Sequence, residues 1–181
     1  DVANIRKVLG IGLVMGLVTS GLFSVLAIFF PHVVLGIYSK DPAVVALGSP
    51  YLRLVGMSYL VTSVTSTYSM VLRSTENVRL PMIVSVFAFS LKTVLAYLLI
   101  FGRLGLPEMG IMGAALSTVI ARYLECGLLL ISVYRRPSPL AARLRDMLNF
   151  DWGFLKRFLK TSMPVVVGEF GWALGGTVYT I

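Results

Sequence analysis

Long apolar runs separated by short polar segments make up most of the chain. Four of them reach the length of about 20 residues that a membrane-spanning helix needs, covering about residues 8–30, 54–72, 80–102 and 110–134. A fifth begins near Ser162 and continues to the end of the chain. Strands are rarely so long or so evenly apolar, and a helix satisfies its own backbone groups in lipid. We therefore predict an all-α membrane helix bundle with about five spanning helices.

Composition agrees with this pattern. The 181 residues are 57% hydrophobic and only 13% charged, whereas a soluble domain usually carries about 25% charged residues. A soluble core of this size cannot hide so much apolar surface, so we expect the lipid bilayer to be a partner. The chain starts at Asp1 without a visible signal peptide and ends inside an apolar run. We interpret it as an internal fragment whose missing helices belong to the rest of its own chain.

Positive charge sets the orientation. The net charge is +8, which in a soluble protein would suggest nucleic acid, but here the cations gather at the ends of the predicted helices. If the helices alternate in direction, eleven of the 16 Lys and Arg residues fall on one side and three on the other. The remaining two, Lys92 and Arg122, lie inside helices. Because positive loops stay in the cytoplasm, the first helix should start there, and no nucleic-acid partner is expected.

The long connection over residues 135–161 is basic and would also be cytoplasmic. Pro137 and Pro139 end the fourth helix. Asp151 can cap a following helix in which apolar residues alternate with Lys156, Arg157 and Lys160. Such a basic amphipathic helix would lie on the inner leaflet; a simple tether between two bundles is an equal alternative.

Lys92 carries the sharpest chemical signal. It lies about 11 residues, or roughly 16 Å of helical rise, from either end of its run, too deep for its stem to reach water at the surface. It should therefore face the bundle or a wet cavity. Ser85, Ala88 and Ala96 share its face and would let a neighbouring helix approach. Lys92 would be a substrate-cavity charge or a proton-linked group; the alternative is a structural ion pair between helices.

The fourth run contains a second pair of charges. Arg122 and Glu125 are three residues apart, a spacing that brings both to one helix face. We predict an intramembrane ion pair, with a structural role favoured over a functional one.

Hydroxyl groups and glycines line two other runs. Positions 62, 65, 66 and 69 form a hydroxyl stripe, in which Ser66 and Ser69 could line a polar cavity or join helices. The joining role is favoured. Gly12 and Gly16, four residues apart, predict a close-packing face on the first helix.

Several chemistries find no support. With one histidine (His32), one cysteine (Cys126) and no clustered carboxylates, we expect no metal site, no catalytic residues and no enzyme activity. No phosphate-binding glycine loop is present either, so no cofactor is expected.

Two sequence stretches resemble the MATE (multidrug and toxic compound extrusion) family. They are MVLRSTENVRLPM at 70–82 and YLLIFGRLGLPEMGIMGAALSTVIAR at 97–122. The resemblance implies a twelve-helix, two-lobe transporter of which this chain supplies helices three to six and the start of helix seven. Residues 1–134 would belong to the first lobe, 135–161 to the inter-lobe linker and 162–181 to the second lobe.

The family also implies a function. We expect a secondary active antiporter in the bacterial inner (plasma) membrane that exports amphipathic, often cationic, small molecules, driven by H⁺ or Na⁺. A flippase of lipid-linked sugars and a non-transporting membrane scaffold are the alternatives.

This chain departs from its family at one informative place. Many members carry Asn and, four residues later, Asp at the positions of Lys92 and Ala96, a pair implicated in cation coupling. Coupling must then use another acid, or the fixed charge of Lys92 replaces a bound cation.

A second family-like run ends the chain. One branch shows Pro-x-x-x-Asn-Glu-x-x-Trp where this chain has Pro164, Gly168, Glu169 and Trp172. Glu169 would be a proton or cation site, or simply a solvated or capping residue. Trp172 shares its face and would stack on an aromatic cation or only pack.

Overall fold

The first apolar run forms a single long helix. The computed structural model describes residues 2–105, 107–135 and 152–180, and in it α1 covers Val2–Phe29. A short helix, α2 (Pro31–Tyr38), follows directly. Proline is tolerated at its first turn because the amide it lacks would have no partner there.

The second span differs from the prediction. Instead of one helix over 54–72, the chain forms α3 (Pro42–Gly56) and α4 (Tyr59–Ser74), which meet at a bend of 51°. Asp41 caps α3 by accepting a hydrogen bond of 2.9 Å from the amide of Ala43. The polar segment at 39–42 thus contains the start signal of a helix.

The third and fourth runs match their predictions within a few residues. They form α5 (Arg79–Ile100) and α6 (Ile111–Arg135), joined by the short helix η1 (Arg103–Gly105). Gly102 allows this sharp connection because its φ is +61° and a side chain there would lie 2.8 Å from the amide nitrogen of Glu108.

The last helix, α8 (Trp152–Thr180), runs continuously through Pro164. The sequence predicted two helices here, one in the linker and one starting at the proline. Residues 136–151 of the predicted linker, including the Asp151 cap, lie outside the described residues. The division of the chain at 135–161 therefore stays a prediction.

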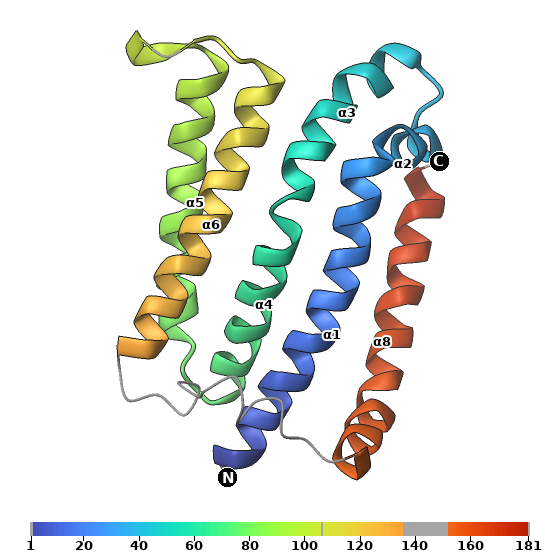
Figure 1. Ribbon diagram of the computed structural model, residues 1–181, viewed down its shortest axis with the longest axis vertical. Helices are drawn as coiled ribbons and strands as arrows, with labels where there is room; N and C mark the ends of the chain where they lie inside the picture. Colours follow the sequence, from blue (N-terminus) through green and yellow to red (C-terminus); the bar gives the residue numbers. More distant parts are fainter. Residues whose placement is uncertain (1, 106, 136–151, 181) are drawn as a thin grey trace.

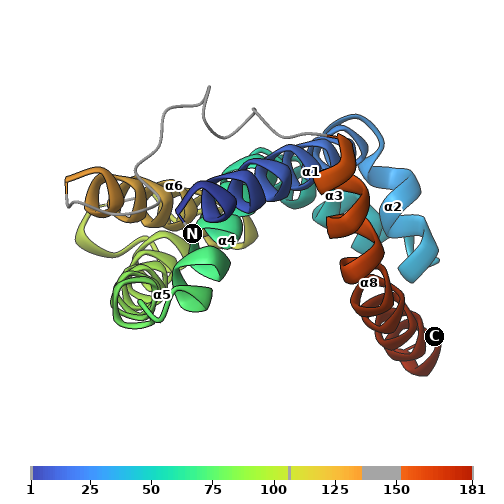
Figure 2. The ribbon, with the colours of Figure 1, turned by 90° about the horizontal axis from the view of Figure 1, so that it is seen from below.

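The long helices run up and down in an open, curved row (Figure 1). Seen from below, α5 and α8 lie at its two ends on the same side of α6, α4 and α1 (Figure 2). An apolar cluster joins the lower halves of α1, α4, α5 and α6. Its buried members are Leu9, Tyr68, Val71, Leu72, Val84, Leu129 and Val133.

The membrane assignment rests on length and hydropathy. Three helical segments, Asn4–Phe29, Arg79–Ile100 and Ile111–Arg135, are long and apolar enough to span a bilayer, and the bent α3–α4 pair makes a fourth if it counts as one span. Large apolar side chains remain exposed along them, such as Val18 and Phe89, each 70% exposed. An all-α, multi-pass membrane fold is confirmed. The predicted fifth span, now in α8, is not among these helices.

Candidate functional site

Helices α5 and α6 form the framework of the candidate site. Near the loop that joins them they pack in backbone contact, because Gly113 has no side chain. A Cβ atom there would lie 2.7 Å from the carbonyl carbon and oxygen of Leu99. Further along, the same two helices are linked by polar and charged side chains instead.

Glu125 of α6 is the centre of that polar link. Its carboxylate accepts a hydrogen bond of 2.8 Å from Ser85 Oγ on α5 and one of 2.9 Å from Arg122 Nη1 on its own helix. The Glu125 side chain is 8% exposed, whereas that of Arg122 is 44% exposed. The Arg122–Glu125 pair that the spacing predicted is therefore present, and it is tied to α5 through Ser85. Nothing in the sequence pointed to that serine as the partner.

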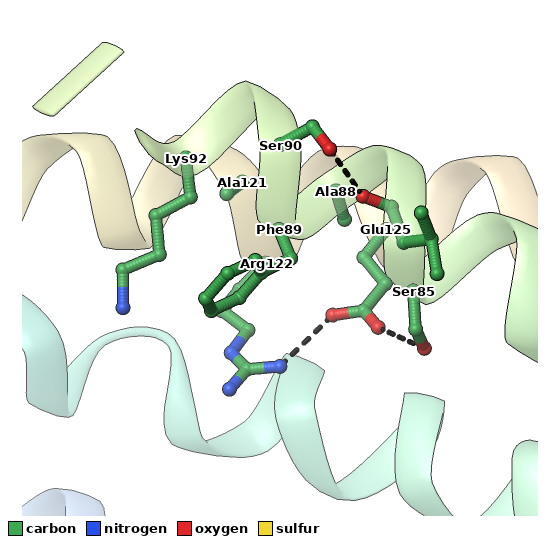
Figure 3. Close-up of a pocket in the computed structure, with 9 residues that line it drawn as sticks. Ser85, Ala88, Phe89, Ser90, Lys92, Ala121, Arg122 and Glu125 are labelled. Carbon is green, nitrogen blue, oxygen red and sulfur yellow. Dashed lines mark hydrogen bonds and ion pairs between the residues drawn. The ribbon is translucent and has the colours of Figure 1, made fainter. Parts of the chain in front are cut away.

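Lys92 lies beside this link. It is half-buried and lines a cavity of about 420 Å³ between α5 and α6 together with Ser85, Arg122 and Glu125. Figure 3 shows the Lys92 amine and the Arg122 guanidinium extending from their two helices toward the same side. Within the ranges that the structure describes, no carboxylate pairs with Lys92. Lys92 therefore lies against a cavity between two helices, and its role as a cavity charge or as one half of an ion pair between helices stays a prediction.

A second cavity adjoins the first. Its volume is about 400 Å³, and it lies where α4 meets α5 and α6. Ser66, Ser69 and Arg73 line it from α4, and its other wall is again Ser85, Arg122 and Glu125. Because the two cavities share these three residues, we treat them together as the polar cavity.

Charge distinguishes the polar cavity. Three cationic side chains line it, Lys92, Arg122 and Arg73, against one carboxylate, Glu125. That carboxylate already accepts hydrogen bonds from Arg122 and Ser85. The formal charge of the lining is therefore +2 when all four groups are ionised.

The hydroxyl stripe of α4 lines the polar cavity, with Thr62 and Thr65 as well as Ser66 and Ser69 in the lining. Thr62 and Thr65 donate to backbone carbonyls of their own helix, at Ser58 (2.9 Å) and Val61 (3.0 Å). Ser66 is exposed and Ser69 half-buried, and both line the polar cavity. This arrangement suits a wet lining at Ser66 and Ser69, which stays a prediction.

The other face of α4 packs against α1. A Cβ on Gly16 would lie 2.5 Å from Ser63 Oγ, and one on Gly12 would lie 3.0 Å from Thr67 Cγ2. The glycines therefore form the close-packing face that their spacing predicted. From Gly16 onward the helices leave a groove of about 610 Å³, which is also lined by residues such as Phe23, Tyr59 and Ser66.

Glu169 and Trp172 lie elsewhere. Both are exposed on α8, and Trp172 is 83% exposed. In both ribbon views α8 lies at the opposite end of the row from α5 and α6 (Figures 1 and 2). The structure does not bring these two residues together with Lys92, so a shared site is absent from the described part of the chain.

Two further polar contacts had no signal in the sequence. Tyr68 on α4 and Tyr134 on α6 share a hydrogen bond of 3.1 Å between their hydroxyls, and Ser49 contacts His32 Nδ1 at 3.0 Å. Among the residues with described positions, no group of three or more His, Cys, Asp or Glu side chains is arranged to hold a metal ion.

Comparison with known proteins gives a consistent result. The sequence model of the MatE family matches residues 1–98. A probable multidrug resistance protein NorM from Thermotoga maritima is 30% identical over 126 residues, which is 69% of this chain and 26% of that protein. A probable NorM from Bradyrhizobium diazoefficiens is 24% identical over 91% of this chain and 35% of its own length.

Another relative, described as the uncharacterized transporter YisQ of Bacillus subtilis, is 25% identical over 130 residues, or 72% of this chain. The chain thus spans roughly a third or less of the relatives just named. No solved structure matches it significantly.

Proposed function

This chain belongs to the MatE family, and from that premise we propose that it forms part of a secondary active exporter in the bacterial inner membrane. The exporter would move amphipathic, often cationic, small molecules out of the cell, driven by the entry of H⁺ or Na⁺ down its gradient. Several relatives are named as probable multidrug resistance proteins, which supports a drug-like substrate. Residues 1–134 would complete the first lobe, and 162–181 would begin the second.

The position of Lys92 supports this proposal most directly. A charge near mid-membrane costs roughly 2.5–3.5 kcal/mol on insertion scales, so such residues generally mark a wet path or a specific partner. Here the lysine lines the polar cavity beside Arg122 and has no carboxylate partner in the described ranges. A scaffold has no use for such a charge, which favours a transport path.

The geometry is also suited to alternating access. In transporters of this kind two halves rock around a central site near the bilayer midplane. The polar cavity lies between α4, α5 and α6, and Lys92, which is near the middle of its apolar run, lines it. The α8 helix, at the far end of the row, would lead into the second lobe.

Dye export by cells tests the proposal. Cells that express the complete protein should accumulate less of an amphipathic fluorescent dye such as rhodamine B than cells without it. A gradient uncoupler should abolish the difference because export would lose its driving force. Dye accumulation that the uncoupler leaves unchanged would count against gradient-driven export.

Lys92→Ala tests the cavity separately. We expect the variant to insert and fold, because removing a mid-span charge lowers the cost of insertion, and yet to lose most export. Lys40→Ala, an exposed lysine in the loop before α3, is the matched control. Full export by Lys92→Ala would leave Lys92 with a packing role only.

A further inference from the structure

The charge of the polar cavity does not suit a purely cationic ligand. Lys92 and Arg122 extend into it from adjacent helices, Arg73 lines its α4 side, and only Glu125 opposes them (Figure 3). A cation that entered would meet this excess of like charge, and repulsion between charges near protein is stronger than in bulk water.

Glu125 offsets only part of that repulsion, because its charge is already paired with that of Arg122. Its carboxylate accepts hydrogen bonds from Ser85 Oγ at 2.8 Å and Arg122 Nη1 at 2.9 Å. An incoming cation would have to approach this carboxylate beside the guanidinium of Arg122, which already carries a positive charge next to it. Lys92, in contrast, keeps its donors free within the described ranges, and Arg122 is 44% exposed with only one of its nitrogens committed to Glu125.

We propose that the polar cavity binds an anionic group, a carboxylate or a phosphate, held between Lys92 and Arg122. This inference rests on the proposed function, because it names the chemical class of ligand that the cavity of the exporter would bind. Ionised donors form the stronger hydrogen bonds to such groups, and a guanidinium is shaped for two-point contact with a carboxylate or phosphate. The hydroxyls of Ser66 and Ser69 line the adjoining cavity and can donate to the same ligand. An amphiphile with an anionic or zwitterionic head would fit both the charge and the apolar walls.

The anion can come from two sources, a soluble substrate or a lipid headgroup, and binding measurements on the complete protein in detergent separate them. Fluorescence anisotropy would follow carboxyfluorescein, an anionic dye, and ethidium, a cationic dye, in parallel titrations. We expect carboxyfluorescein to bind more tightly. Adding phosphatidylglycerol to the micelles should displace it if the natural ligand is a lipid phosphate, and should leave it bound if the ligand is soluble; either result is compatible with an anion site.

Variants at Lys92 then locate the site. Lys92→Gln should weaken carboxyfluorescein binding about tenfold or more, the loss expected for one charge-assisted hydrogen bond. Lys92→Arg should retain binding, and Lys92→Glu should abolish it and strengthen ethidium binding. Lys40→Gln should change neither. Unchanged carboxyfluorescein binding in Lys92→Gln would overturn the proposal, as would tighter binding of ethidium than of carboxyfluorescein by the unaltered protein.

Transport and binding are scored separately. Carboxyfluorescein that binds through Lys92 but is not moved by an imposed gradient in proteoliposomes would sustain the anion site and contradict the exporter. Gradient-driven movement of ethidium without any carboxyfluorescein binding would sustain the exporter and contradict the anion site.

Discussion

Two helix pairs in this chain are held together in different ways. The α1–α4 pair closes through glycines that lie against the side chains of Ser63 and Thr67. The α5–α6 pair closes at one end through Gly113 against the backbone of Leu99, and further along opens around Arg122, Glu125 and Lys92. Small residues let helices approach in lipid, whereas charged groups need room for partners and water.

The comparison explains where the functional site can be. The glycine contacts bring α1 and α4 close together at Gly12 and Gly16, and the groove that begins at Gly16 has no charged residue among the described residues that line it. The opposite face of α4 borders the polar cavity. One helix thus serves as a wall of the scaffold on one side and of the cavity on the other.

The largest effect should come from breaking the ionic link of α5 and α6. Arg122→Ala leaves the carboxylate of Glu125, 8% exposed, with Ser85 as its remaining partner. Removing one member of a buried pair costs about 3 kcal/mol or more, because the other charge stays buried. We expect a loss of about that size in the free energy of unfolding, measured by denaturation of the complete protein in mixed micelles.

Glu125→Ala provides the contrasting half of this prediction. It leaves Arg122, which is 44% exposed and can stay solvated in the cavity, so the loss should be clearly smaller, about 1 kcal/mol. The double variant should be more stable than Arg122→Ala alone. If Arg122→Ala and Glu125→Ala lowered the free energy of unfolding equally, the different burial of the two side chains would not determine the cost of losing the partner.

Much of this architecture could be predicted from the sequence, for identifiable reasons. The runs that became α1, α5 and α6 were recognisable because their length and hydropathy are sufficient evidence of a span. The bend between α3 and α4 was missed because it lies inside an apolar stretch, although Asp41-Pro42 is a helix-start signal that could have revealed α3. Local spacing predicted the Arg122–Glu125 pair, whereas the bond from Ser85 depends on how two helices pack, which no local pattern contains.

After Arg122→Ala, we expect Gly113→Ala to lower the free energy of unfolding most. Its new Cβ would lie 2.7 Å from backbone atoms of Leu99. Because backbone atoms, unlike a side chain, cannot rotate out of the way, α5 and α6 would have to move apart. Overpacking of this kind costs about 2 kcal/mol. Gly127→Ala in the same helix meets nothing within 4 Å and is the matched control. A Gly113→Ala protein as stable as the control would mean that the two helices are not in backbone contact there.

Gly16→Ala should change the free energy of unfolding least. This is so although the contact that its added Cβ would make, at 2.5 Å, is shorter than the one at Gly113, at 2.7 Å. The added Cβ would lie 2.5 Å from Ser63 Oγ, but that atom is the end of a side chain that can rotate away, and alanine favours the helix more than glycine does. We expect a change of less than about 1 kcal/mol in the free energy of unfolding, compared with Gly21→Ala, whose Cβ would meet only Leu60 at 3.9 Å. A loss as large as that of Gly113→Ala would show that α1 and α4 meet through rigid backbone as well, and the distinction between the two helix pairs would then rest on charge alone.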